Sequence, residues 1–518
     1  MSALISRLKA LLTTPANIVS FLAGALLVFA YAPYSLWWLT PLLLATWVKS
    51  IDGKSIKQAT VASYCFGLGW FGTGISWVHV SIDQFGGMPL PASLFLMALL
   101  CAYLALFPAL AGYIASRFST GKKLNIWLLP SIWIFTEWLR GWFLTGFPWL
   151  SVGYSQIDSP LSGFAPVVGE VGLTLILLVI AVCVVKLVSK QSIVLHSMAL
   201  LSIAAVTFWL NSTAFTSPTG EIKKVALAQG NIAQELKWKP EQEWPTMVKY
   251  MDLTRQHYNA DLIVWPESAI PTVEPMAKEY LDMANSAAAM NSTAIVTGII
   301  NYNFESREYF NSLVVLGKQN KEDTDGSYYY PNENRFYKHH LLPIGEFVPF
   351  QELLRPIAPF FNLPMSSFTR GDYVQPNLMA NGIQLAPLIC FEIAFPEQLH
   401  ANFSESTDIL LTVSNDAWFG TSHGPHQHME IARMRAREFG RPLIRSTNTG
   451  VTAAVDEQGK FTGRIPQFEE AVLSVDVALV SGQTPFSRYQ KYPTFIFSAF
   501  LFIILLLVSR RQINRLYQ

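Results

Sequence analysis

The chain has 518 residues, of which 51% are hydrophobic and only 14% charged, and its formal net charge at pH 7 is +1. One ordinary hydrophobic core does not hold so many residues, and the apolar excess is typical of a membrane protein that carries a soluble part. The balanced charge excludes the strongly basic character of a nucleic-acid-binding chain, so we expect no nucleic-acid partner.

Uncharged or nearly uncharged blocks dominate the first 219 residues. A helix needs about 20 apolar residues to cross a bilayer, and residues 10–48 are long enough for two spans joined at the sequence YAPYS. Further single spans are predicted at 58–80, 90–114, 125–148, 167–185, 193–213 and 493–509. We therefore predict a polytopic α-helical membrane domain of about eight spans. Residues 1–219 contain all of them except the last, which lies in residues 491–518.

One predicted span contains charged residues. Glu137 and Arg140 lie three positions apart in the block 125–148. Charged side chains inside a membrane are functional candidates by default, but a pair at this spacing also neutralises itself. Both interpretations stay open at the level of the sequence.

Lysine and arginine fall at alternate ends of the predicted spans. The residues at one set of ends are Arg7, Lys9, Lys49, Lys54, Lys57, Arg117, Lys122, Lys123, Lys186, Lys190, Arg510, Arg511 and Arg515. Cytoplasmic loops carry the excess of Lys and Arg. We therefore predict that both termini are cytoplasmic and that residues 220–490 lie outside, which is the oxidising periplasm in a bacterium with an outer membrane.

Residues 220–490 alternate between β-rich runs and helix-period segments. The β-rich runs are KVALAQGNI, DLIVWPE, TAIVTGII, SLVVLG, APLICFE, DILLTVSND, PLIRSTNTG and AVLSVDV. Helix-period segments include 276–289 and 427–439. This alternation predicts a layered α/β domain, in which ligand sites lie beyond the carboxyl ends of strands. Because Glu267, Cys390 and Asn415–Asp416 each close a run, we expect them to meet at one edge of the sheet.

Only one cysteine lies in the charged part of the chain. Cys65, Cys101 and Cys183 lie in apolar stretches, where cysteine behaves as a small hydrophobe. Cys390 instead ends the run APLIC, and an unpaired thiol in an oxidising compartment requires a reason. A thiol of ordinary pKa, about 8.5, becomes a competent nucleophile beside a base and a positive charge. The stretches VWPES and FYKHHLLPIGEFVPF offer a carboxylate and a lysine for these roles.

These stretches together resemble a known superfamily. Their order along the chain is similar to the Glu-Lys-Cys triad pattern of the nitrilase (carbon–nitrogen hydrolase) superfamily. The motifs are Trp-Pro-Glu, then Lys-His-His with Gly-Glu-Phe, then Cys-Phe-Glu. With the flanking spans, the whole chain resembles the apolipoprotein N-acyltransferase family, whose members add the third acyl chain to bacterial lipoproteins. The resemblance implies a nitrilase-like αββα sandwich for residues 220–490 and a location in the bacterial inner membrane. It also implies no cofactor, a membrane phospholipid as acyl donor and diacylglyceryl apolipoproteins as acceptors.

The resemblance also implies roles for individual residues. Glu267 is expected to be the general base and acid, Cys390 the nucleophile that forms a thioester, and Lys338 the residue that stabilises the oxyanion. Supporting acidic residues would hold Lys338 charged or orient the acceptor amine. The supporting candidates are Glu346 and Glu392, and the substrate-binding candidates are Trp238, Phe391 and Trp418.

Several alternatives remain at this level. The stretch SHGPHQHME contains His423, His426, His428 and Glu430, but their spacing fits no standard metal-ligand set and the triad needs no metal, so no metal site is predicted. A membrane-tethered amidase or nitrilase would use the same triad with water as acceptor. A non-catalytic lipid-binding scaffold would use the fold without the chemistry.

A long apolar loop follows the second motif. Residues 346–370 read EFVPFQELLRPIAPFFNLPMSSFTR, rich in Phe, Leu and Ile and interrupted by prolines. Such a stretch resists both a long helix and a regular strand. We expect residues 350–368 to form a lid that enters the outer leaflet and shields a thioester from water.

Overall fold

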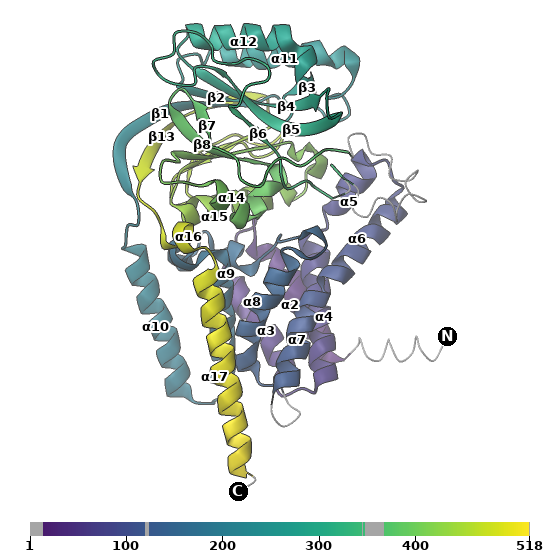
Figure 1. Ribbon diagram of the computed structural model, residues 1–518. Coiled ribbons are helices and arrows are strands. Elements are labelled where there is room, and N and C mark those ends of the chain that lie inside the picture. Colours follow the sequence, from purple (N-terminus) through teal and green to yellow (C-terminus); the bar gives the residue numbers. More distant parts are fainter. Residues whose placement is uncertain (1–13, 120–123, 344, 348–366, 517–518) are drawn as a thin grey trace. The chain divides into compact units, whose positions relative to one another are not determined.

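The structure is a computed structural model that describes residues 14–119, 124–343, 345–347 and 367–516 (Figure 1). The chain divides into two compact units. The described residues of Met1–His79, Pro89–Ala214 and Arg488–Gln518 form the helical unit. Val80–Met88 and Phe215–Ser487 form the second unit. A short segment between two predicted spans therefore belongs to the second unit. Most of the predicted lid 350–368, namely residues 350–366, lies outside the described residues.

The helical unit is built from apolar α-helices joined by short turns. Its helices are α2 (Pro15–Leu26), α3 (Leu39–Ile51), α4 (Ile56–Gly74), α6 (Leu90–Leu104), α7 (Leu106–Phe118), α8 (Leu129–Arg140), α9 (Ala165–Val188), α10 (Ile193–Asn211) and α17 (Tyr492–Leu516). Several 3₁₀ turns connect them: η1 (Leu27–Ala30), η3 (Ile126–Leu128), η4 (Phe143–Thr145), η5 (Val152–Gln156) and η6 (Pro160–Phe164). The short helix α5 (Val78–Val80) ends at the first residue of the second unit's segment.

Three segments of the described chain are long and apolar enough to cross a membrane. They are Leu90–Phe118, Pro160–Val188 and Ile193–Asn211. Shorter apolar helices cover Pro15–Ala30, Leu39–Ile51 and Tyr492–Val508. These segments agree with a membrane protein, but they do not confirm about eight spans. The block 125–148 differs most, because its α-helix α8 has 12 residues, which reach about 18 Å against a hydrocarbon thickness of about 30 Å.

The charged pair of this block binds irregular backbone. Arg140 Nη2 lies 2.6 Å from Glu137 Oε2, and the arginine is 1% exposed. Arg140 Nη1 also donates to the carbonyls of Phe147 and Trp149. Non-helical backbone in a membrane protein needs buried partners for its polar groups. The pair thus neutralises itself and also holds the chain that follows α8.

Two facing sheets form the centre of the second unit. The first, seven-stranded, has the order β13-β1-β2-β4-β5-β6 with β3 beside β4. Its strands are β1 (Ser217–Gln229), β2 (Leu262–Val264), β3 (Ile270–Val273), β4 (Ala294–Asn303), β5 (Glu308–Gly317), β6 (Arg335–Tyr337) and β13 (Ala471–Ser481). The second sheet has the order β12-β11-β10-β9-β8-β7. Its strands are β7 (Leu378–Ala380), β8 (Ile383–Ile389), β9 (Ile409–Ser414), β10 (Leu443–Thr447), β11 (Ala453–Val455) and β12 (Phe461–Arg464).

The middle strands of each sheet run parallel, and their apolar side chains face both ways. β1, β2 and β4 are parallel neighbours, as are β8, β9 and β10. One buried cluster joins the two sheets, with Leu227 and Val264 from the first and Ile389 and Leu411 from the second. A second cluster joins the first sheet to α11 (Pro240–Arg255) and α12 (Lys278–Met290). With α14 (Pro396–Asn402) and α15 (Gly424–Phe439) beside the second sheet, the unit has four layers, αββα (Figure 1).

The predicted runs and helices of this unit are confirmed, but one inference from them is wrong. Every β-rich run contains a strand, and the segments 276–289 and 427–439 overlap α12 and α15. Glu267, however, follows a strand of the first sheet, whereas Cys390 and Asn415 follow strands of the second. They meet across the sandwich and not at one edge of one sheet. Buried parallel strands of both sheets are equally apolar, so the pattern does not show to which sheet a strand belongs.

Candidate active site

Cys390 sits at a sharp junction. Strand β8 ends at Ile389, and the 3₁₀ helix η9 (Cys390–Ala394) begins with the cysteine. The backbone φ of Cys390 is 55°, in the left-handed region that residues with a Cβ seldom enter. The strand end therefore turns abruptly and presents the cysteine at the edge of the sheet.

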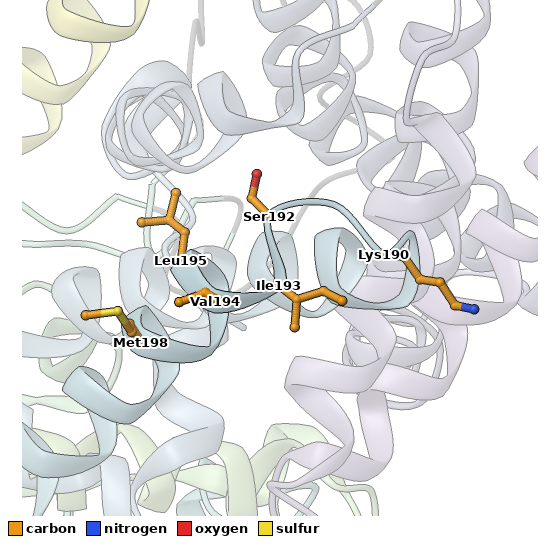
Figure 2. Close-up of a pocket in the computed structure, with 6 residues that line it drawn as sticks. All are labelled: Lys190, Ser192, Ile193, Val194, Leu195 and Met198. Atoms are coloured by element: carbon orange, nitrogen blue, oxygen red, sulfur yellow. The ribbon is translucent and has the colours of Figure 1, made fainter.

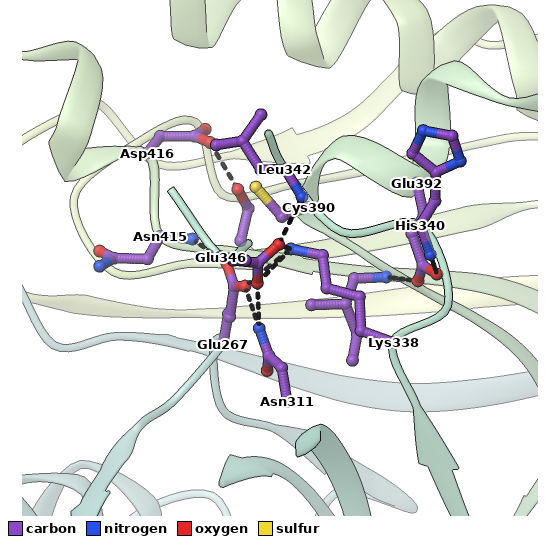
Figure 3. Close-up of polar contacts among 12 residues, drawn as sticks. Glu267, Asn311, Lys338, His340, Leu342, Glu346, Cys390, Glu392, Asn415 and Asp416 are labelled. Carbon is purple, nitrogen blue, oxygen red and sulfur yellow. Dashed lines mark hydrogen bonds and ion pairs between the residues drawn. The ribbon is translucent and has the colours of Figure 1, made fainter. Parts of the chain in front are cut away.

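Lys338 is a buried cation between two carboxylates. It follows β6, is 1% exposed, and places Nζ 2.8 Å from Glu346 Oε2 and 3.4 Å from Glu267 Oε1 (Figure 3). Burial alone would lower the pKa of Lys338, but the charges of Glu346 and Glu267 raise it above its ordinary value. Lys338 is therefore positively charged. The sequence predicted that Glu346 would hold Lys338 charged, and the contact between Glu346 and Lys338 agrees with this role.

Glu267 is held by groups that favour its charged form. Asn311 Nδ2 donates to Glu267 Oε1 at 2.8 Å, and the backbone N–H of Asn415 donates to Oε2 at 2.9 Å. Burial opposes the charge of this carboxylate, but Lys338 and Asn311 outweigh burial and lower the pKa of Glu267. Asn311 also donates to Glu346 Oε1 at 2.9 Å, so one amide aligns both carboxylates.

The thiol and the carboxylate have opposite pKa shifts. Burial raises the pKa of Cys390, and the negative charge of Glu267 raises it further, although Lys338 opposes both. The resting site therefore contains a protonated thiol beside an ionised carboxylate. This combination suits general base catalysis, in which the proton leaves as the sulfur attacks, and not a preformed thiolate.

Glu392 binds backbone and not the reacting groups. Its carboxylate accepts from the N–H groups of Ile389 (2.8 Å), His339 (2.8 Å) and His340 (3.0 Å) and from Gln398 Nε2 (2.6 Å). These bonds tie the segment after Lys338 to the turn that presents Cys390 (Figure 3). Burial raises the pKa of Glu392, and the N–H donors lower it in part. Orientation of an acceptor amine by Glu392 stays a prediction.

The three predicted substrate-binding residues lie in different surroundings. Phe391 is buried and packs edge-on against Phe395, with ring centroids 5.1 Å apart. Trp238 is 37% exposed. The backbone carbonyl of Trp418 accepts from Ser81 Oγ at 2.7 Å. Phe391 thus packs against Phe395 in this structure, and contact of Phe391 and of the two tryptophans with an acyl chain stays a prediction.

A second lysine near the base carried no signal in the sequence. Lys237 is 3% exposed, and its Nζ donates to the backbone carbonyl of Glu267 at 3.1 Å. Burial lowers the pKa of Lys237 to about 8. Asn311, which lies inside β5, was missed as well, because a single asparagine in a strand forms no pattern that points to a site.

A buried polar network lies on the other side of Cys390. Ser414, Asp416, His428 and Arg445 are each at most 1% exposed and hydrogen-bond to one another. His428 belongs to the histidine-rich stretch considered above as a metal site. In the structure its ring contacts Asp416, Arg445 and the carbonyl of Cys390.

A separate hollow of about 530 Å³ lies in the helical unit, at the turn between α9 and α10 (Figure 2). Its lining consists of Lys190, Ser192, Ile193, Val194, Leu195 and Met198. This lining contains none of the predicted site residues, so the candidate chemistry belongs to the cluster around Cys390.

Comparisons with known proteins agree with this geometry. Residues 23–183 match the family model of the apolipoprotein N-acyltransferase N-terminal domain, and residues 224–484 match that of carbon–nitrogen hydrolase. A protein of Shewanella oneidensis named apolipoprotein N-acyltransferase is 52% identical over 501 residues, covering 96% of each chain. The chain belongs to the apolipoprotein N-acyltransferase family.

Other members of the apolipoprotein N-acyltransferase family match along nearly the whole chain. The Photobacterium profundum relative is 48% identical, covering 95% of each chain, and the Vibrio vulnificus relative is 50% identical, covering 93% of this chain and 95% of its own. Among solved structures, Saccharomyces cerevisiae Nit3 of the nitrilase superfamily overlays with a TM-score of 0.37 at 15% identity, covering 54% of this chain and 97% of that one. The nitrilase-like fold of the second unit rests on the match of residues 224–484 to the carbon–nitrogen hydrolase family.

Proposed function

We propose that this protein transfers an acyl chain from a membrane phospholipid to the N-terminal amine of S-diacylglyceryl-cysteine in apolipoproteins, through a thioester on Cys390. The observation that supports this most is the ionised Glu267 beside the protonated Cys390, with Lys338 shared between Glu267 and Glu346. Family membership supplies the substrate class, because the relatives are named apolipoprotein N-acyltransferases.

The first step loads the acyl chain. As Cys390 Sγ attacks the ester carbonyl carbon of the phospholipid, Glu267 takes the thiol proton. Lys338 Nζ and a backbone N–H near Cys390 stabilise the oxyanion. The ester C–O bond then breaks, Glu267 gives the proton to the departing alkoxide, and the lyso-phospholipid leaves.

The second step transfers the acyl chain. The α-amine of the diacylglyceryl-cysteine attacks the thioester carbonyl, an amide forms, and the C–S bond breaks. Glu267 takes a proton from the amine and returns it to the sulfur. A thioester is more reactive than the ester before it or the amide after it, so the sequence of steps needs no ATP.

Glu346 has a definite task in this scheme. When Glu267 accepts a proton it loses the charge that helps to hold Lys338. Glu346, at 2.8 Å, still neutralises the lysine and keeps its position. The oxyanion therefore meets a charged Lys338 at the moment when the base is neutral.

The decisive experiment detects the thioester. Purified protein given phospholipid without acceptor should gain one acyl chain on Cys390, seen by mass spectrometry and removed by neutral hydroxylamine. Adding a diacylglyceryl peptide should move that chain to the peptide amine. Cys390→Ala should block loading, whereas Cys183→Ala, a cysteine of the helical unit, should load normally.

The other outcomes identify the rival functions. Lyso-phospholipid and free fatty acid without N-acyl peptide would indicate a membrane-tethered hydrolase. Neither lyso-phospholipid nor N-acyl peptide would indicate a non-catalytic lipid-binding scaffold. Acylation of a residue other than Cys390 would contradict the thioester step.

We further propose that the chain crosses the inner membrane about eight times, with residues 220–490 in the periplasm and both termini in the cytoplasm. The alternation of Lys and Arg along the chain supports this arrangement. Cysteines introduced at exposed positions of the second unit should react with a membrane-impermeant thiol reagent in spheroplasts. Cysteines placed after Arg511 should not react, and the opposite pattern would reverse the topology.

A further inference from the structure

The backbone of Cys390 is strained at the point where the chemistry takes place. Its φ of 55° lies in the left-handed region, which residues with a Cβ seldom adopt. Such a conformation persists only where the surrounding structure determines it. The aim of the Cys390 sulfur therefore depends on the groups that bind its backbone.

His428 binds the carbonyl of this strained residue. His428 Nε2 lies 3.0 Å from the carbonyl oxygen of Cys390, and the histidine is 1% exposed. A carbonyl oxygen only accepts hydrogen bonds, so Nε2 carries the hydrogen whatever the charge of the ring. Because the peptide unit is planar, this bond restrains the orientation of the peptide between Cys390 and Phe391.

The histidine ring is held by buried charges. His428 Nδ1 lies 3.0 Å from Asp416 Oδ1 and 2.9 Å from Arg445 Nη2. Arg445 Nη2 also donates to Asp416 Oδ2 at 2.8 Å. Burial, and then the charge of Arg445, lower the pKa of His428. A neutral ring with its hydrogen on Nε2 donates to Cys390 and accepts from Arg445 at Nδ1. Asp416 then receives its hydrogen bonds from Arg445 and Ser414 and not from the ring.

Buried ionic networks often serve only the stability of a fold. This one differs because it contacts Cys390 at both ends. His428 binds the carbonyl of Cys390, and Ser414, which donates to Asp416 Oδ1 at 2.5 Å, also acts on the thiol, whose pKa it lowers. Both the backbone and the sulfur of Cys390 are therefore set by the same network.

We propose that His428 is a positioning residue for acyl transfer, which holds the Cys390 carbonyl through Nε2–H and thereby keeps the sulfur aimed at the acyl donor. This inference rests on the proposed function of Cys390 as the nucleophile. It gives a role to one histidine of a stretch whose composition suggested a metal site, and it requires no metal.

Two amide variants separate positioning from stability. Gln extends its Nε2 to about the place of the imidazole Nε2, whereas Asn reaches only the place of Nδ1. His428→Asn thus keeps a polar group beside Asp416 but loses the bond to Cys390. We expect loading of Cys390 at saturating phospholipid to fall about 10²-fold in His428→Asn, because small misplacements of a reacting group cost about this much. The phospholipid concentration for half-maximal rate should change little in His428→Asn. The His428→Gln protein should load about tenfold faster than the His428→Asn protein.

The control is Met434→Ala, a fully buried residue of the same helix α15. It should lower the unfolding temperature in detergent without a comparable loss of loading rate. Equal loading by His428→Asn and Met434→Ala proteins of similar stability would overturn the inference, as would a Gln variant no faster than the Asn variant. If the His428→Asn protein does not fold, the test uses the folded His428→Gln protein, which keeps the hydrogen bond to Cys390. Loading that is slowed 10²-fold in His428→Gln would then refute the inference. Absence of loading in the unmodified protein would instead refute the proposed function.

Discussion

Two buried ionic clusters flank Cys390, and they have opposite compositions. The cluster around Lys338 has one cation and two carboxylates, whereas the cluster around Asp416 has one carboxylate, an arginine and a histidine. Contacts in the second cluster are all 3.0 Å or shorter, but Lys338 lies 3.4 Å from Glu267.

The difference indicates a division of work. Surplus negative charge and one long contact leave Glu267 able to accept a proton without breaking up its cluster. The closed second cluster has strong contacts throughout, which suits a group that holds the nucleophile and does not titrate. Damage to the first cluster should therefore appear mainly in rate. Loss of an ion-pair partner from the second should appear mainly in stability, whereas His428, which binds the carbonyl of Cys390, should affect the rate.

The largest expected effect on rate comes from Glu267→Gln. The amide has nearly the same shape but cannot take the thiol proton, so loading of Cys390 should slow by about 10²–10⁴-fold. Single-turnover loading followed by mass spectrometry measures this. The unfolding temperature in detergent should change much less than the rate, and a variant that loads normally would remove Glu267 from the mechanism.

Arg445→Met should have the largest effect on stability. Asp416 would keep only His428 and Ser414, and removing one partner of a buried ion pair costs about 3–5 kcal/mol. Thermal unfolding in detergent is the measurement. Glu346→Gln is the matched change in the first cluster and should lower the unfolding temperature less, because Lys338 keeps Glu267. Equal destabilisation by both variants would contradict the division between the clusters.

A smaller effect on rate is expected from Asn311→Leu. Asn311 Nδ2 donates to both Glu267 and Glu346, and a hydrogen bond to a charged group contributes about 1.5–3 kcal/mol. Loading should slow by about tenfold if roughly half of that acts in the transition state. Asn301→Leu is the control, since Asn301 is also buried and binds a different carboxylate, Glu274, at 2.8 Å. Similar slowing in both variants would point to general damage to the first sheet.

The smallest effect concerns pH. Glu267 must be ionised to act as base, so loading is present above its pKa and is lost as pH falls through it. That pKa is lowered, and the acid limb should lie below the ordinary glutamate value of about 4.3. Lys237 contributes to the lowering, so Lys237→Met should move the limb to higher pH. Loading rates across the acidic range test this, with folding checked at each pH, and an unmoved limb would exclude an effect of Lys237 on Glu267.

Local patterns were enough for much of the second unit. Each β-rich run contains a strand, because a short apolar run bounded by turn residues is typical of a strand in any buried sheet. The missed strands β3, β6, β7, β11 and β12 have only three or four residues, too few to show a period. The α-helix of block 125–148 is shorter than the block for a related reason: an apolar composition does not reveal where a helix ends.

By itself the sequence determined the family motifs and the alternating layers, and it predicted Glu267, Lys338 and Cys390 as the catalytic residues, because each motif depends on residues near one another in the chain. Only the tertiary structure decided that Glu267 approaches Cys390 from a different sheet. Only the structure, too, placed Asn311, Lys237 and the His428 network at the site. These residues are separated by tens to hundreds of positions and carry no shared pattern. Their chemistry arises from burial and from distances of about 3 Å, which exist only once the two sheets have packed together.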